Sequence, residues 1–127
     1  MTDFTISTEH NRARPAATIA FADGGAAASS IDFYDSAEVL LATIHLARPC
    51  GVVSADKLVL SQADPTADLV LATGLADHAI WHRSDAVLVA RGPVTDETGI
   101  GPFVLQGAGG LNLYAGGLIV LGVTAIA

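Results

Sequence analysis

Residues 78–92, HAIWHRSDAVLVARG, decide the fold, because they hold the only tryptophan of the chain and two of its four histidines. In a helix, His78 and His82 would lie on one face, close enough to bind a single metal ion. In a strand they lie about 13 Å apart, on one face but too far apart to share an ion. The alternating residues SDAVLVARG and the turn-forming pair Ser84–Asp85 favour two strands joined by a hairpin.

The strand interpretation assigns each side chain of this segment to a face. One face carries Ala79, Trp81 and Arg83, and the other carries His78, Ile80 and His82. Trp81 is then an anchor in the core or at an interface, and its indole N–H needs one hydrogen-bond partner. Both locations for Trp81 remain open at this point.

Alternation continues on the N-terminal side of this segment. Ile31 and Phe33 share a face in SSIDFYD (29–35), and EVLLATIHLA (38–47) alternates in the same way. In the second segment the fully apolar face is formed by Leu40, Ala42, Ile44 and Leu46. Turn residues recur about every 8 to 12 residues, which is typical of sandwiches and barrels. We therefore predict an all-β fold, an antiparallel, jelly-roll-like β-sandwich without a helix longer than about ten residues.

The first 15 residues differ from the rest of the chain. They are polar and show no sustained period, and Pro15 biases Arg14 toward an extended conformation. The total length of 127 residues corresponds to one domain. We predict an extended N-terminal arm at residues 1–15 and a single β-sandwich domain at residues 16–127.

Charge and composition exclude several classes of function. The net charge is −7, from 13 acidic and 6 basic residues, so a nucleic-acid partner is not expected. Cys50 is the only cysteine, which excludes an intrachain disulfide and a thiolate metal site. Residues 98–127 carry no charge, but their glycines, Pro102 and Asn112 predict strands and turns rather than a membrane span. The N-terminus lacks the pattern of a secretory signal, so we expect cytoplasmic synthesis.

No motif in the chain predicts catalysis. The serines lack the G-x-S-x-G pattern of a hydrolase, and the glycine-rich segments 99–103 and 107–117 lack the pattern of a phosphate loop. The acidic pairs lack the spacing of a calcium loop. We predict no catalytic residues, no metal ligands and no cofactor, and hence a binding or structural protein rather than an enzyme.

Four segments, taken in order, resemble a known class of proteins. They are IDFYD (31–35), LLATIHLARPCG (40–51), AIWHRSDAVLVARGPV (79–94) and LNLYAGGLIVLGVTAI (111–126). Together they are similar to small β-sandwich virion proteins of tailed bacteriophages, over roughly residues 31–126. The chain departs from that pattern at His82, where the family usually has phenylalanine, and at Ser84–Asp85, where the family has a fuller D-G turn.

The resemblance implies a head decoration or cement protein that binds the major capsid protein on the outer surface of the head and is assembled in the host cytoplasm. An acidic surface suits the exterior of a shell. We also expect self-association, with a trimer at symmetry points of the capsid as the expected form. The candidate interface residues are Phe4, Arg12, Arg14, Tyr34, Trp81, Arg83 and Tyr114.

Two alternatives belong to other classes of function. A tail-tip or fibre-associated component that binds carbohydrate at a sandwich edge is favoured if Tyr34 or Tyr114 is exposed near a loop end. A small-ligand-binding or enzymatic sandwich is favoured if a deep pocket brings His45, His78 or His82 together with a carboxylate.

Overall fold

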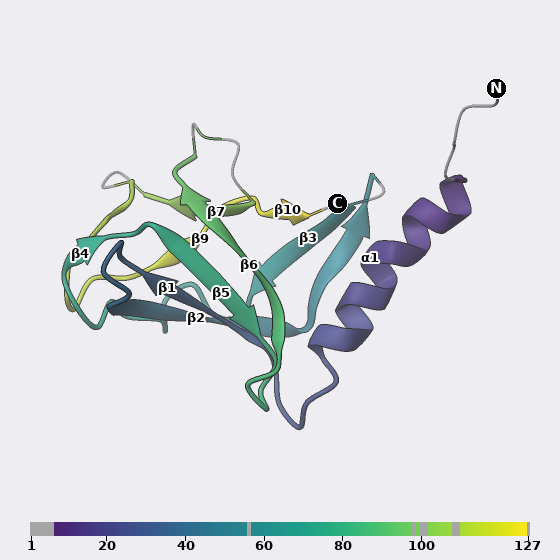
Figure 1. The fold of residues 1–127 in the computed structure, drawn as a ribbon, viewed down its shortest axis with the longest axis horizontal. Coiled ribbons are helices and arrows are strands. Elements are labelled where there is room, and N and C mark those ends of the chain that lie inside the picture. The colour runs from purple at the N-terminus through teal and green to yellow at the C-terminus, as the bar shows by residue number, and fades with distance from the viewer. Residues whose placement is uncertain (1–6, 56, 98, 100–101, 108–109, 127) are drawn as a thin grey trace.

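The computed structural model describes residues 7–55, 57–97, 99, 102–107 and 110–126, and strands are their commonest regular structure (Figure 1). The elements are α1 (Thr8–Ala22), β1 (Ser30–Tyr34), β2 (Leu40–Ser54), β3 (Lys57–Gln62), β4 (Gly74–Leu75), β5 (His78–His82), β6 (Leu88–Thr95), β7 (Phe103–Gln106), β8 (Asn112–Leu113), β9 (Val120–Leu121) and β10 (Ala125–Ile126).

Eight of the strands form one sheet, in the order β10-β3-β2-β1-β5-β6-β7-β9. β9 and β10 are neighbours in the chain but lie at opposite ends of this order, so the C-terminal segment brings the two edges together. The sheet therefore nearly closes into a barrel. β4 and β8 form a separate two-stranded sheet. The all-β prediction is confirmed, whereas this topology does not confirm the jelly-roll-like sandwich.

The prediction of a purely antiparallel fold is wrong at one position, because β6 and β7 are parallel, with Val94 opposite Phe103. Between these strands the chain turns back on itself, and the amide of Gly99 donates to the carbonyl of Asp96. The chain then resumes its earlier direction in β7. The sheet is consequently mixed.

The side chain of Gln62, at the end of β3, contacts the segment that leads into β9. Its Nε2 donates to the carbonyl of Ile119 at 3.0 Å, and its Oε1 accepts from the amide of Leu121 at 3.0 Å. The side-chain amide of Gln62 thus provides one donor and one acceptor to the backbone of residues 119–121, as the backbone of a neighbouring strand would. The side chain of Gln62 therefore connects β3 to β9, two strands that are not neighbours in the sheet order.

The hairpin predicted at Ser84–Asp85 is confirmed. The amide of Ala86 donates to the carbonyl of Arg83 at 2.9 Å, and the amide of Arg83 donates to the carbonyl of Val87 at 2.8 Å. Ser84 and Asp85 are therefore the central residues of the turn. Ala86 follows with a φ of 67°, a left-handed conformation that alanine rarely adopts.

We expect Ala86→Gly to stabilise the protein. Glycine adopts positive φ without the steric cost that alanine incurs there, although it also has more freedom to lose on folding. The free energy of unfolding is expected to rise by about 0.5–1 kcal/mol, measured by urea denaturation. Ala90→Gly, inside β6, is the control and is expected to lower it by a similar amount. Equal effects of the two substitutions would contradict the left-handed conformation of Ala86.

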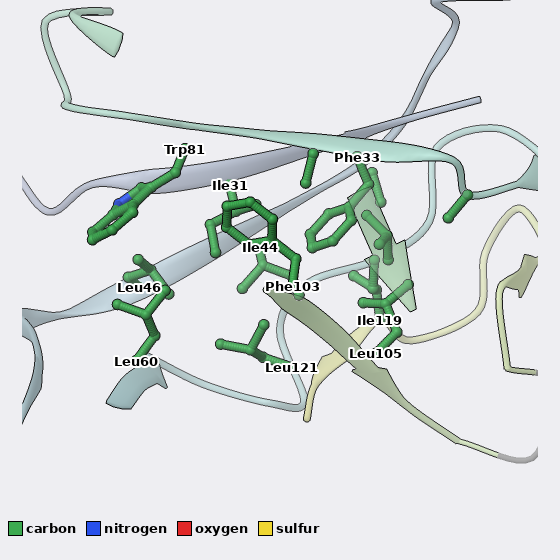
Figure 2. Packing of buried hydrophobic residues seen from close by; sticks show 14 of the residues in the cluster. Ile31, Phe33, Ile44, Leu46, Leu60, Trp81, Phe103, Leu105, Ile119 and Leu121 are labelled. Carbon is green, nitrogen blue, oxygen red and sulfur yellow. The ribbon is translucent and has the colours of Figure 1, made fainter. Parts of the chain in front are cut away.

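Trp81 lies in the core. The alternation predicted for β5 is confirmed, since Ala79 and Trp81 are fully buried while His78, Ile80 and His82 are partly exposed. The indole N–H donates to the Oγ of Ser29 at 3.1 Å, which supplies the partner that a buried indole needs. Figure 2 shows the larger apolar side chains pointing into the space between the strands, among them Ile31, Phe33, Ile44, Leu46, Trp81 and Phe103.

The apolar face predicted for β2 is confirmed from Ala42 onward but is wrong at Leu40. Tyr34 pairs with Leu40, and Phe33 pairs with Ala42. The extra residue in β2, Leu41, is therefore turned inward and is fully buried, while Leu40 is 36% exposed. A β-bulge of this kind reverses the faces of the strand on its far side.

The N-terminal segment is a helix where the sequence predicted an extended arm. α1 covers residues 8–15 of that arm, and the predicted domain boundary after residue 15 falls inside it. Alanine is the best helix former and is frequent in ARPAATIAFA, so the segment tolerates Pro15 at the cost of one backbone hydrogen bond. α1 packs outside the barrel along β2 and β3 (Figure 1), with Pro15 and Ala22 buried. Phe4 lies outside the described residues.

Candidate functional site

Each of the three histidines whose side chains the structure describes contacts a carboxylate. His45 Nδ1 lies 2.7 Å from Asp68 Oδ1, and His82 Nε2 lies 3.0 Å from Asp32 Oδ2. His78 makes two such contacts, through Nδ1 to Asp77 at 2.9 Å and through Nε2 to Glu38 at 3.2 Å. His78 and His82 thus contact separate carboxylates.

His78 and Tyr34 form a stacked pair between β5 and β1, with ring centroids 5.5 Å apart. The hydrogen bond to Asp77 raises the pKa of His78 above its usual value, and the contact with Glu38 adds to this effect. Burial, followed by the negative charge of Asp32, raises the pKa of the Tyr34 phenol. Tyr34 therefore has one ring face occupied by a neighbouring side chain.

His82 uses both ring nitrogens. Nε2 faces Asp32, and Nδ1 lies 2.9 Å from the carbonyl of Arg83. The hydroxyl of Thr43 donates to the other oxygen of Asp32 at 2.6 Å. The groups of this cluster therefore bind one another. Among the described residues, no three His, Cys, Asp or Glu side chains are grouped as metal ligands.

A hollow of about 430 Å³ brings His45 together with a carboxylate. The side chain of Asp68 is 4% exposed and that of His45 is 66% exposed, so a buried carboxylate orients an accessible imidazole. An imidazole held in this way can accept a proton as a general base. The nearby hydroxyl of Thr43 lines the hollow but donates to Asp32, so it is not activated by His45.

Asp68 accepts further hydrogen bonds besides its contact with the His45 ring. Its Oδ2 accepts from the backbone amide of His45 at 3.1 Å and from Gln62 Nε2 at 2.8 Å. The backbone of Asp68 accepts from the amide of Ile119 at 3.0 Å. Because Gln62 links β3 to β9, Asp68 connects the hollow to the closure of the barrel.

The fold also brings together two charge-free segments, residues 69–76 and 110–126. The amide of Val70 donates to the carbonyl of Gly117 at 2.8 Å, Leu69 bridges Leu118, and β4 pairs with β8. Large apolar side chains are exposed on this surface, which we call the uncharged face. They are Leu69 (50% exposed), Leu71 (65%), Leu75 (58%), Tyr114 (64%) and Leu118 (52%).

The uncharged face is not flat. A hollow of about 260 Å³ lies in it, with Tyr114 and Leu118 in its lining. Gln106 and Asn112 also line this hollow and add amide groups to an otherwise apolar surface. The larger hollow beside His45 borders the same face through Leu69 and Leu71.

Arg83, a predicted interface residue, contacts the protein's own helix. Its guanidinium lies over the ring of Phe21, 5.1 Å from the ring centroid, and donates to Asp85 at 2.9 Å. It therefore links α1 to the β5–β6 hairpin. Trp81, fully buried, cannot contact a partner in the folded protein.

The predicted interface residues whose side chains are described do not form one surface, since Trp81 is fully buried. Arg12 and Arg14 lie in α1, where Arg14 is exposed. Tyr34 stacks on His78. Tyr114, far from Tyr34 in the sequence, is exposed on the uncharged face. Sequence reasoning missed Leu69, Leu71 and Leu118, whose signal was the absence of charge around them in two separate segments.

Cys50 is fully buried in β2. Burial, and then the nearby carboxylate of Asp23, raise the pKa of its thiol to about 12. The thiol is therefore protonated and unreactive at neutral pH, as expected for a small buried residue.

Comparisons with known proteins do not assign the chain to a family: no family model, no curated protein and no solved structure matches it. Within the described residues, no helix combines the length and the apolar character that crossing a membrane requires.

Proposed function

We propose that this protein is a structural virion protein of a tailed bacteriophage, a decoration or cement protein that binds and stabilises the shell of the major capsid protein. The observation that carries the proposal is the uncharged face, where the large apolar side chains of Leu71, Tyr114 and Leu118 are more than half exposed. Monomeric soluble proteins rarely leave such area exposed, so it marks a surface that another protein covers. The order of the four segments that resemble phage virion proteins supports the same class.

The distribution of polar groups supports assembly rather than chemistry. Two of the carboxylates that contact histidines are also held by other side chains, Asp68 by Gln62 and Asp32 by Thr43. A chain with a net charge of −7 is repelled by packaged DNA and suits the outer surface of the head. In this proposal the protein assembles as a homo-oligomer, with three copies at symmetry points of the shell.

Sedimentation with phage heads tests the proposed function. Heads lacking the protein are incubated with the purified chain, and the sedimented fraction is analysed for bound protein. We expect saturable binding at a fixed number of copies per capsid protein, and a rise in the temperature at which the heads open. Absence of the protein from the sedimented heads would overturn the assignment to the capsid.

Tyr114 favours a second candidate, a tail-tip or fibre-associated protein that binds carbohydrate. Its ring is 64% exposed beside the hollow that Gln106 and Asn112 also line. Exposed aromatic rings contact the apolar faces of sugars, and amides donate and accept hydrogen bonds with their hydroxyls. Binding of cell-surface glycans that Tyr114→Ala abolishes would select this function over capsid decoration.

A further inference from the structure

His78, the first residue of β5, has a carboxylate at each of its two ring nitrogens. Nδ1 lies 2.9 Å from Asp77 Oδ2, and Nε2 lies 3.2 Å from Glu38 Oε2. An ionised carboxylate only accepts hydrogen bonds, and a neutral imidazole carries a proton on one nitrogen alone. Both contacts are therefore hydrogen bonds only when both nitrogens carry protons. The geometry around His78 is that of an imidazolium cation.

The ring of His78 is held in this position by its neighbours. Tyr34, its partner in β1, stacks on it with the two ring planes 11° apart, and the side chain of His78 is only 12% exposed. The amide of Asp77 donates to the carbonyl of Tyr34 at 2.8 Å, which fixes the backbone that carries one of the two carboxylates. The ring cannot turn toward solvent without losing the stacked contact. A change in its protonation therefore acts on the two carboxylates.

Glu38 belongs to the turn at residues 35–39, which connects β1 to β2 (Figure 1). Its φ is 64°, a left-handed conformation that is sterically costly for glutamate. Within the turn, the amide of Val39 donates to the carboxylate of Asp35 at 2.9 Å, and the amide of Glu38 donates to the carbonyl of Asp35 at 3.1 Å. The side chain of Glu38 leaves the turn and contacts His78, 40 residues further along the chain. This contact joins the turn to β5.

Other titratable or charged side chains lie on the segments around this cluster. They are Asp32 and Tyr34 on β1, Asp35 in the turn, His82 on β5 and Arg91 on β6. Asp32 is bound by Thr43 and His82, and Asp35 by amides of its own turn. The pKa of the Tyr34 phenol is raised, so Tyr34 is uncharged at neutral pH. Arg91 is exposed and pairs with Ile80, two residues along β5, so solvent screens its charge. The carboxylates of Asp77 and Glu38 therefore determine the protonation of His78.

We propose that His78 is a pH-dependent clamp, which holds the turn at residues 35–39 on β5 while both ring nitrogens carry protons and releases it when one proton is lost. The remaining proton stays on Nδ1, because Asp77 is the nearer carboxylate and lies next to His78 in the chain. The lone pair of Nε2 then faces Glu38, and the two acceptors repel each other. Glu38, whose side chain is 66% exposed, moves into solvent and adds a free carboxylate to those of Asp35 and Asp77 at this end of the molecule. The inference does not depend on binding to a capsid.

The direction of the pH effect follows from the pKa of His78. The hydrogen bond to Asp77 raises this pKa, burial lowers it, and the contact with Glu38 raises it, with a net rise. A histidine whose pKa is higher in the folded than in the unfolded chain stabilises the fold below the unfolded pKa. It loses this contribution as the pH rises through the folded pKa. The turn is therefore held at acidic pH and released above the pKa of His78.

NMR titration of the full chain between about pH 5 and about pH 9 tests the clamp. We expect the ring of His78 to titrate above the ordinary histidine pKa, and the backbone amides of Glu38 and Val39 to shift with the same midpoint. In Glu38→Gln the ring should titrate at lower pH and the two amides should no longer follow it. The reason is that a side-chain amide donates or accepts, and so contacts Nε2 in either protonation state. Glu97→Gln is the matched control, because it removes the same charge from an exposed position after β6 and should leave both titrations unchanged.

Hydrogen exchange separates release of the turn from a change in local charge alone. The amides of Glu38 and Val39 are bound within the turn. After correction for the intrinsic pH dependence of exchange, we expect their protection to be about fivefold lower above the midpoint of His78 than below it. A ring that titrates at or below the ordinary histidine pKa would overturn the inference. So would equal protection on both sides of the midpoint, or turn amides that still follow His78 in Glu38→Gln.

Discussion

Trp81→Ala is expected to lower the free energy of unfolding by about 3–5 kcal/mol, a large fraction of the 5–15 kcal/mol typical of a small domain. The indole is fully buried between β5 and the rest of the core, so its removal leaves a cavity that rigid strands cannot close. It also removes the donor that binds Ser29, whose hydroxyl is buried. Urea denaturation followed by circular dichroism measures the change without relying on tryptophan fluorescence.

Two neighbouring substitutions separate the causes. Trp81→Phe keeps most of the apolar volume but loses the bond to Ser29, so we expect a loss of about 1–2 kcal/mol. Ile80→Ala changes the adjacent residue on the outer face of β5, where we expect a loss of about 1 kcal/mol or less. If Ile80→Ala destabilised the protein more than Trp81→Ala, the faces of β5 would be reversed.

The strands that the sequence predicts correctly are those in which one face is fully covered. In β1 and β5 every second residue is buried, and a period of two is then visible in the residues themselves. β2 is harder, because the bulge at Leu41 depends on pairing with β1 and leaves no mark on an apolar run such as VLLA. Pattern alone predicts a face only up to the first irregularity in pairing.

The helix was missed for a different reason. α1 contains few large apolar residues, so it has little amphipathic pattern, and Pro15 is a signal against helix at its centre. The signals that favour it are weaker, namely the alanines and Glu9 in the first turn. Its packing on β2 and β3 supplies the stability that local preference does not.

The candidate surfaces depend on contacts that no local pattern contains. Leu69 and Leu118 are 49 residues apart in sequence (118 minus 69) and become neighbours only because β4 and β8 pair beside them. For residues 98–127 the sequence predicted only strands and turns, and nothing in residues 69–76 alone indicates that their leucines are exposed. Exposure appears only when the sheet order is known, since the inner face of the barrel is already filled by residues such as Phe103 and Ile119.

Asp68→Ala is expected to lower the free energy of unfolding by about 2–4 kcal/mol, because it leaves two donors without an acceptor in a place that water reaches poorly. The backbone amide of His45 and the Nε2 of Gln62 both donate to Asp68, whose side chain is 4% exposed. Gln62 would lose one of the bonds that fix it, and the amide of Leu121 donates to that same side chain. We therefore expect faster hydrogen exchange at Leu121, measured by NMR.

Asp64→Ala is the matched control, since Asp64 also accepts two hydrogen bonds, both from Thr66, but is exposed to solvent. Water replaces the carboxylate there, so the stability should change little and exchange at Leu121 should not change. Asp68→Asn is expected to fall between the two, because its amide keeps one acceptor oxygen but presents an N–H₂ group toward Gln62. Equal stability of Asp68→Ala and Asp64→Ala would show that the barrel closes without Asp68. The carboxylate beside His45 would then make no contribution to the stability of the fold.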